Sequence, residues 1–277
     1  MSKLVLHTLA FLLSPAAAGS ENEILVQRDL REKAERFVSQ VQTPDQNDEP
    51  MARFTDPLCV GSAGLPKEAG QAIVDRVSNT ALSVGLKIGP PGCPPNIMIV
   101  FVDGIREAVK QVHSTGSRSI ASQAKADVKR IVSEKGDAIS WIEVATKSTL
   151  GEKPYTVPND PAILNVWTSS NLSMPIRRDI LSATVLIELK AVPGRSLLQI
   201  ADYAAMRALT GAKGRGGLGS QSVLSAFTPD GDATAARELT KQDRGYLLGL
   251  YKGRSDLKPV MKRQYITSEI AGADLEK

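Results

Sequence analysis

Apolar residues along this chain recur either in short runs, which favour strands, or at the 3.6-residue spacing of a helix. Both patterns meet between Ala183 and Leu209, where they predict a buried strand over 184–189, a turn, and a helix that begins near Ser196. Ser196 is a suitable N-cap residue. Small and apolar residues then follow at helical spacing: Leu197, Ile200, Ala201, Ala204, Ala205 and Ala208. Because alanines let a helix approach its neighbours closely, we expect this helix to pack on a sheet.

A second series of alternating elements precedes this unit. The pattern predicts a short strand at 58–60, a helix over 67–84, a strand over 97–102 and a helix over 105–112. The run at 97–102 is continuously apolar, which is typical of a strand that is covered on both faces. The alternation of strand and helix favours a small α/β unit in this part of the chain.

The region between these two units predicts one more helix and two strands. The helix spans 117–133, and the strands at 139–145 and 163–167 are joined by a long irregular segment, as in a hairpin or meander. Trp141 and Trp167 fall on these strands. We expect both tryptophans to be core residues, with a stacking surface for a sugar as the alternative.

Both ends of the chain have helical patterns. Near the start, apolar residues between Leu30 and Val41 form one helical face, and the polar stretch 43–50 is expected to be a loop. Near the end, Thr240 and Asp243 have the spacing of a capping box, which predicts that a helix starts there. The final stretch, 258–270, is basic and weakly amphipathic.

Together these elements predict an α+β fold with a mixed sheet, packed helices and a helical C-terminal part. A chain of 277 residues is long enough to bury a sizeable core. We expect four regions: a signal peptide over 1–18, an N-terminal helix and linker over 19–50, a small α/β part over 51–135, and a sheet with the helical C-terminal part over 136–277.

The first residues have the organisation of a secretory signal peptide. Lys3 precedes an apolar run from Leu4 to Leu13, and Ala16 to Ala18 match the small residues of a cleavage site. The alternative, a membrane anchor, would need about 20 apolar residues. We therefore expect cleavage near Ala18 and a periplasmic or secreted protein without a transmembrane segment.

Composition argues against nucleic acid as a partner. Removal of residues 1–18 takes one of the 34 basic residues and none of the 30 acidic ones, which leaves 33 against 30. Aromatic residues make up only 4% of the chain, so platforms for base stacking are scarce. A small net charge and few aromatics predict no nucleic-acid partner.

The two cysteines, Cys59 and Cys93, are predicted to form a disulfide, because an even pair is expected to oxidise in an exported protein. Such a bond could contribute up to about 4 kcal/mol in the chain-entropy model. A metal pair or a catalytic thiol would need further ligands or a base. His113 is the one His that would remain after cleavage, so we expect neither a metal nor a cofactor.

Polar residues near the central strand and helix are the candidates for a binding site. Asp202, Tyr203 and Arg207 lie on the predicted helix, and Arg177 and Arg178 precede the strand. If Asp202 faces the core it needs a cationic partner, and the two arginines are the nearest suppliers by pattern. The group is then either a structural salt bridge or a polar cluster that binds a ligand.

Three passages carry a family resemblance: RRDILSATVLIELKAVPGRSLLQIADYAAMRAL, SQSVLSAFTPDGDATAARELTKQDRGYLLGLY and, more weakly, PGCPPNIMIVFVD. They resemble a family of uncharacterised exported proteins from sphingomonad-like alphaproteobacteria. In that family a helix like QLADYAAMR precedes an ILxLF segment and an LTxxDxxYLxxLY helix. The likeness spans most of the chain after the signal peptide.

The order of these elements is also similar to a broader group of secreted bacterial proteins. Their central helix sits where metallopeptidases carry the zinc-binding His pair, and the corresponding residues here, Gln199 to Tyr203, contain no His. The resemblance therefore implies a degenerate metallopeptidase-like scaffold without its metal, and no catalytic residue.

These observations favour a non-catalytic role, as a protein that binds an envelope protein or a small ligand. The alternative is a metal-independent hydrolase of peptide or cell-wall material, with Asp202 or Glu188 as acid or base. Interaction through the N-terminal helix or the basic tail is a third hypothesis.

Overall fold

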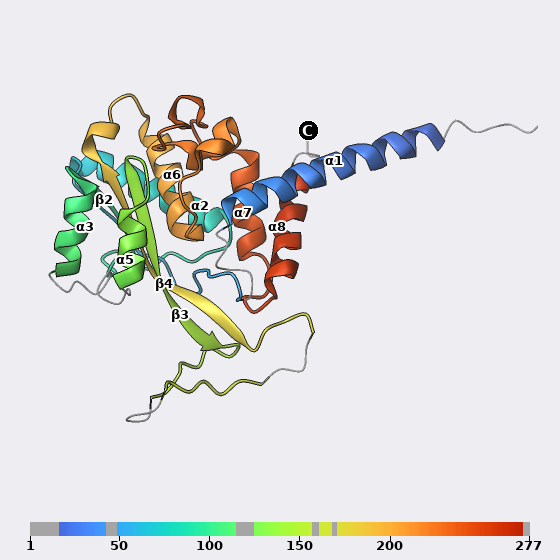
Figure 1. The fold of residues 1–277 in the computed structure, drawn as a ribbon, viewed down its shortest axis with the longest axis horizontal. Coiled ribbons are helices and arrows are strands. Elements are labelled where there is room, and N and C mark those ends of the chain that lie inside the picture. Colours follow the sequence, from blue (N-terminus) through green and yellow to red (C-terminus); the bar gives the residue numbers. More distant parts are fainter. Residues whose placement is uncertain (1–16, 43–48, 115–124, 157–160, 168–170, 274–277) are drawn as a thin grey trace, which may run out of the picture.

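The structure, a computed structural model, describes residues 17–42, 49–114, 125–156, 161–167 and 171–273. It confirms the α+β class with a mixed sheet (Figure 1). The four strands lie in the order β1-β2-β4-β3, with β1, β2 and β4 parallel and β3 antiparallel to β4. Their bounds are β1 Val60–Ala63, β2 Ile97–Val102, β3 Ala138–Ser148 and β4 Ile176–Glu188.

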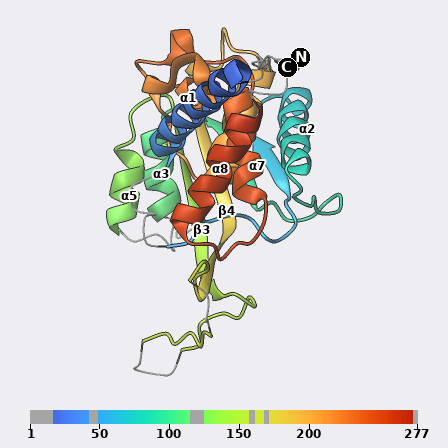
Figure 2. The ribbon, with the colours of Figure 1, turned by 90° about the vertical axis from the view of Figure 1, so that its right-hand side faces the viewer.

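Helices cover both faces of this sheet (Figures 1 and 2). One face carries α3 (Ile105–Ser114) and α5 (Lys125–Val132). The other face carries α2 (Lys67–Ser83) and α6 (Leu197–Thr210). Beyond α6 lie the three helices α7 (Lys241–Tyr251), α8 (Pro259–Ala273) and α1 (Ala17–Val41). Strands from both predicted parts of the chain therefore share one sheet.

The alternation of side chains along β2 and β4 explains their apolar sequences. Ile99 and Val185 belong to the larger core, on the α2 and α6 side, whereas Val100 and Leu186 belong to the smaller core under α3 and α5. Successive residues of a strand point to opposite faces. A strand with helices on both faces must therefore be apolar at every position, as the run 97–102 predicts.

Both ends of α6 have the expected caps. The Ser196 Oγ accepts a hydrogen bond from the Gln199 backbone N–H (3.1 Å), which confirms the predicted N-cap. Gly211 ends the helix with a φ of 67°, a left-handed conformation that glycine adopts without strain. Residues 199–210 of α6 are all buried, so the helix is surrounded by protein along nearly its whole length.

Two glycines let α7 and α8 pack closely. A Cβ atom on Gly249 would lie 2.4 Å from the Ile266 Cα, and one on Gly245 would lie 2.8 Å from the Ile270 Cα. The helix begins at the predicted capping box, in which the Asp243 backbone N–H donates to Thr240 and the Asp243 carboxylate accepts from the Thr240 backbone.

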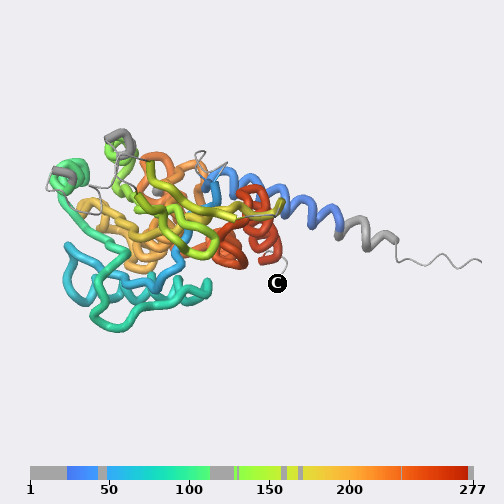
Figure 3. Tube along the Cα trace, turned by 90° about the horizontal axis from the view of Figure 1, so that it is seen from below, coloured from blue at the N-terminus to red at the C-terminus, as the bar shows by residue number. Residues whose placement is uncertain are grey.

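The C-terminal half of α1 packs on α8 and α7. Its predicted apolar face is buried at Ala34, Phe37, Val38 and Val41, and half-buried at Leu30. The preceding part of the helix projects from the body of the protein (Figures 1 and 3). Across the described residues, none of the helices combines the length and the apolar composition needed to cross a membrane.

The predicted disulfide is confirmed. Cys59 and Cys93 are bonded, with Cα atoms 6.0 Å apart. The bond ties the residue before β1 to the turn that leads into β2.

The connection between β3 and β4 differs from the predicted one. β3 is confirmed, but it pairs with residues 176–188, and 163–167 is no strand. Ile163 instead forms an isolated bridge with Tyr155. Trp141 is a core residue, as expected, whereas the prediction for Trp167 is wrong because its side chain is 91% exposed. β3 pairs with β4, which is a longer strand than 163–167 could form. This pairing outweighs the strand propensity of 163–167.

Other predicted elements have different bounds in the structure: the strand predicted at 184–189 is the last part of the longer β4, which begins at Ile176. The strand predicted at 58–60 is β1 at Val60–Ala63, with Leu58 in an isolated bridge to Ile88. Of the helix predicted over 117–133, the structure describes 125–132 as α5. Residues 117–124, and residues 1–16 of the predicted signal peptide, lie outside the described part of the chain.

The C-terminal carbonyls of α7 are capped by two cations from other elements. Arg53 donates to the Tyr251 carbonyl (3.0 Å), and the Lys262 Nζ donates to the carbonyl oxygens of Leu250 (3.3 Å) and Lys252 (2.7 Å). Burial, with Arg53 nearby, lowers the pKa of Lys262 to about 8. Proton release from this amine therefore differs between the folded and unfolded states.

We expect Gly249→Ala to destabilise the protein by about 1–3 kcal/mol, because its Cβ would push α7 away from α8. Gly272→Ala, in α8 with no atom near its Cβ position, is the matched control and should be neutral or slightly stabilising. Chemical denaturation of both variants measures the difference. Equal stabilities would contradict the close packing of the two helices.

Lys262→Met should change how stability depends on pH. The pKa of Lys262 is lower in the folded state than in the unfolded state, so between pH 8 and pH 10 the unfolded state binds more protons and stability rises with pH. From pH 7.5 to pH 9.5 the wild type should gain about 1–2 kcal/mol relative to Lys262→Met. Urea denaturation at the two pH values tests this, and a constant difference would contradict it.

Candidate functional site

Helix α6 carries three candidate polar side chains that point in two directions. Asp202 and Tyr203 are adjacent and lie about 100° apart around the helix, whereas Tyr203 and Arg207 are one turn apart on one face. All three are fully buried. A buried charge is costly unless it is paired and hydrogen-bonded, so the partners of these side chains decide what this region can do.

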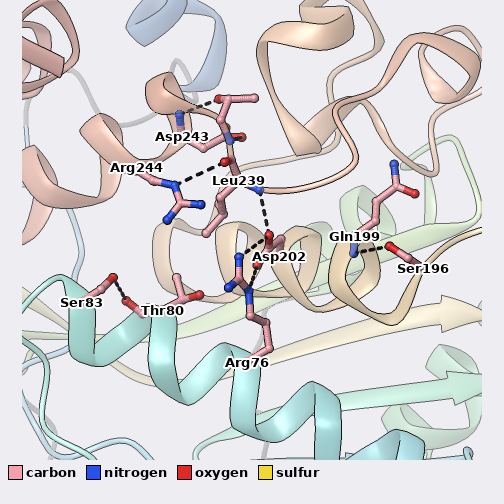
Figure 4. A network of polar contacts seen from close by, with 10 residues as sticks. Arg76, Thr80, Ser83, Ser196, Gln199, Asp202, Leu239, Asp243 and Arg244 are labelled. Atoms are coloured by element: carbon pink, nitrogen blue, oxygen red, sulfur yellow. Dashed lines mark hydrogen bonds and ion pairs between the residues drawn. The ribbon is translucent and has the colours of Figure 1, made fainter. Parts of the chain in front are cut away.

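Asp202 is held by α2 and by the segment before α7. Arg76 donates from Nε to Oδ1 (2.6 Å) and from Nη2 to Oδ2 (2.9 Å), and the Leu239 backbone N–H donates to Oδ2 (2.8 Å), as Figure 4 shows. The hydrogen bond to Asp202 raises the pKa of Arg76. The expectation that Arg177 or Arg178 would pair with Asp202 is therefore wrong.

The two arginines of β4 pair with other acids. Arg177 Nη2 lies 3.1 Å from the Asp179 Oδ2, which also binds the Lys147 Nζ at 2.7 Å. Arg178 pairs with Glu49 at 3.2 Å. Asp179 is fully buried, so this triad holds the base of the β3–β4 hairpin together. The structure does not bring Arg177 or Arg178 together with the polar side chains of α6.

Arg207 is the centre of a second buried cluster. Its Nε donates to the Ser140 hydroxyl (2.8 Å), its Nη1 donates to the Tyr203 hydroxyl (2.5 Å), and its Nη2 forms an ion pair with Glu134 (2.8 Å). Burial by itself would lower the pKa of Arg207, but Tyr203 and Glu134 outweigh it and raise that pKa. The cluster joins α6 to β3 and to the segment after α5.

The segment after α6 closes over this cluster. The Gly214 backbone N–H donates to Glu134 (3.2 Å), and a Cβ atom on Gly214 would lie 3.2 Å from the guanidinium of Arg207. The Tyr203 ring packs against Phe227, with ring centroids 4.8 Å apart. Burial raises the pKa of Tyr203 to about 12, so this hydroxyl is protonated at neutral pH and is a poor general base.

Glu188, the other candidate acid or base, caps a helix. Its carboxylate accepts hydrogen bonds from the backbone N–H groups of Gly104 (3.0 Å) and Ile105 (2.8 Å), at the start of α3. Burial would raise the pKa of Glu188, but these two donors lower it. A carboxylate held in this way stabilises the N-terminus of α3.

Metal chemistry requires several converging ligands. Among the residues that the structure describes, no three or more His, Cys, Asp or Glu side chains come together as a group that could hold a metal ion.

Exposed apolar side chains gather on the described part of the connection between β3 and β4, residues 149–156, 161–167 and 171–175, which we call the arm. Leu150, Tyr155, Ile163, Val166 and Trp167 are all exposed there. The arm projects from the end of the sheet (Figures 1 and 2). Its two legs are joined by reciprocal backbone hydrogen bonds between Tyr155 and Ile163, both 2.9 Å long.

A cavity of about 410 Å³ lies between α1, α7 and α8. We call it the α1 pocket. Its floor is formed by the buried side chains of Ala34, Phe37 and Ile270. Its rim carries two cations and three side-chain amides, from Lys33, Arg36, Gln40, Gln221 and Gln242. Sequence analysis did not identify this site, because its residues come from three separate parts of the chain.

Comparison of the chain with protein-family models, with curated proteins and with solved structures gives no significant match.

One missed partner did leave a signal in the sequence. Arg76 lies three residues after Ile73 and four before Thr80, so it flanks the buried stripe of α2. A cation at such a position needs an acidic partner where the facing element buries it. Glu134 and Leu239 left no such signal, since they lie in irregular segments that only the tertiary structure places near α6.

We expect Arg76→Ala and Asp202→Ala each to cost about 2–4 kcal/mol, with a coupling energy of about 2 kcal/mol in the double variant. Asp75→Ala is the matched control: its exposed side chain contacts only the Gln71 amide among the described residues, and it should change stability by less than about 0.5 kcal/mol. Urea denaturation measures the cycle. Strictly additive single-variant effects would show that the pair contributes no specific interaction.

Proposed function

We propose that this protein is exported to the cell envelope and acts there as a non-catalytic binding protein on a metallopeptidase-like scaffold, with the arm as its contact surface for a partner protein. The observation that carries the proposal is the contrast between the side chains of α6 and those of the arm. The polar side chains of α6 are buried and paired inside the protein, whereas large apolar side chains are exposed together on the arm.

The chemistry of the arm favours a protein as its partner. Aromatic side chains such as Trp167 and Tyr155 are enriched at the energetic centres of protein interfaces. Glu152, Lys153 and Asp160 are the charged residues in the sequence 149–175, so this connection has no cluster of cations of the kind that binds anionic lipid surfaces. An apolar surface on another protein fits these properties better.

Export is supported by two further features. Residues 1–18 have the pattern of a signal peptide, with the cleavage site near Ala18. The bond between Cys59 and Cys93 is a kind of bond that persists in an oxidising compartment. Mass spectrometry of the N-terminus of protein from the periplasmic fraction tests the cleavage directly.

The arm can be tested with a photo-crosslinking amino acid in place of Trp167, in the cells that produce the protein. We expect one adduct of defined mass, which is lost when Leu150→Ser is added. Because Leu150 is 85% exposed, this substitution should leave the melting temperature unchanged. The crosslinker at Leu82, an exposed position on α2, is the matched control and should not form the adduct.

Both the crosslinking experiment and enzyme assays can contradict the proposal. Crosslinks to lipid alone, or equal crosslinking from positions 167 and 82, would contradict the proposal. Turnover of peptides or cell-wall fragments would also contradict the proposal, if Asp202→Asn or Glu188→Gln abolished this turnover without changing the melting temperature. A metal-independent hydrolase would give this result.

A further inference from the structure

We infer that the α1 pocket binds a short peptide or an N-acylated amino acid that carries a free carboxylate and an apolar side chain. The site is separate from the arm, and the inference does not depend on the arm's function. The volume of the α1 pocket, about 410 Å³, lies within the range of small-molecule sites, roughly 300–1,000 Å³.

The floor of the pocket is suited to an apolar group. Phe37 and Ile270 are buried core residues whose side chains also line the cavity, and they come from α1 and α8. The close packing of α7 on α8 at Gly245 and Gly249 holds this floor in place. The floor residues are already buried, so the favourable term comes from the apolar surface of the ligand itself, which would leave water on contact with them.

The charge of the rim is suited to a carboxylate. Arg36 and Lys33 line the pocket, and none of the described residues that line it is acidic. Lys33 is engaged by Asp29 at 3.3 Å, both on the exposed face of α1. Arg36 is thus the better anchor, and its planar guanidinium can bind both oxygens of a carboxylate.

The three side-chain amides give the pocket its preference for a peptide. Gln40 lies one turn after Arg36 on α1, Gln242 lies in the first turn of α7, and Gln221 precedes η4, a 3₁₀ turn at Val223–Ser225. Each amide offers both a donor and an acceptor, as a peptide group does. The pocket therefore combines three amides, an apolar floor and the Arg36 guanidinium. This combination matches an acylated amino acid better than a sugar or a bare phosphate.

The test uses N-acetyl-leucyl-leucine as the probe, with its C-terminal amide as the reference compound, in calorimetric titrations at low salt. The acid should bind about tenfold more tightly than the amide, because only the acid forms a charge-assisted pair with Arg36. Arg36→Gln should remove this tenfold preference and leave binding of the amide unchanged. Arg31→Gln is the matched control, since Arg31 is an exposed arginine of α1 outside the pocket.

A second variant and a second measurement keep the test independent of stability. Gln242→Glu should weaken binding of the acid more than binding of the amide, because the added carboxylate repels only the acid. In amide NMR spectra the probe should shift the side-chain signals of Gln40, Gln221 and Gln242.

Three results with the wild type would overturn the inference. They are equal affinities of acid and amide for the wild type, no binding of either compound at about 10 mM, and NMR shifts confined to the arm. Equal losses in Arg36→Gln and Arg31→Gln would also overturn it. Because the arm is tested by crosslinking at position 167, failure of one experiment leaves the other proposal standing.

Discussion

The burial of α6 is the constraint on which the rest of the structure depends. Residues 199–210 lie inside the protein, yet they include Asp202 and Arg207, whose charges cannot be left unpaired in a dry interior. Their partners come from α2, β3, the segment after α5 and the segment before α7. Each of these elements is therefore positioned partly by a charge on one central helix, and removal of a single partner would leave a buried ion.

This arrangement also determines what the polar groups of α6 do. A general acid or base must reach its substrate with a proton to accept or donate near neutral pH. Tyr203 is neutral over that range, Arg207 is permanently charged, and Asp202 is occupied by three hydrogen bonds. The polar groups that attract notice in the sequence are thus used to join elements together.

The two surfaces that we propose as binding sites lie away from that centre. The arm extends from the β3–β4 hairpin, whose base is held by the buried Asp179 triad. The α1 pocket forms where a helix from the start of the chain packs on two helices from its end. The two places differ in their residues: those of the arm are apolar and exposed, whereas those at the rim of the pocket carry cations and amides.

Local signals in the sequence determined the elements themselves. The apolar run 97–102, the N-cap at Ser196 and the capping box of Thr240 and Asp243 all specify structure through contacts within a few residues, and each was confirmed. The pairing of Cys59 with Cys93 was also predictable, because only two cysteines are present. These features need no knowledge of the rest of the chain.

Tertiary structure alone decided which residues meet. Asp202 pairs with Arg76 across 126 positions of sequence, and strand β3 selects residues 176–188 over the nearer 163–167, so Trp167 becomes exposed. The pocket joins Arg36 to Gln242 and is invisible to any local pattern. The physical reason is the same in each case: periodicity reports which face of an element is buried, whereas the partner of that face depends on packing among all the elements at once.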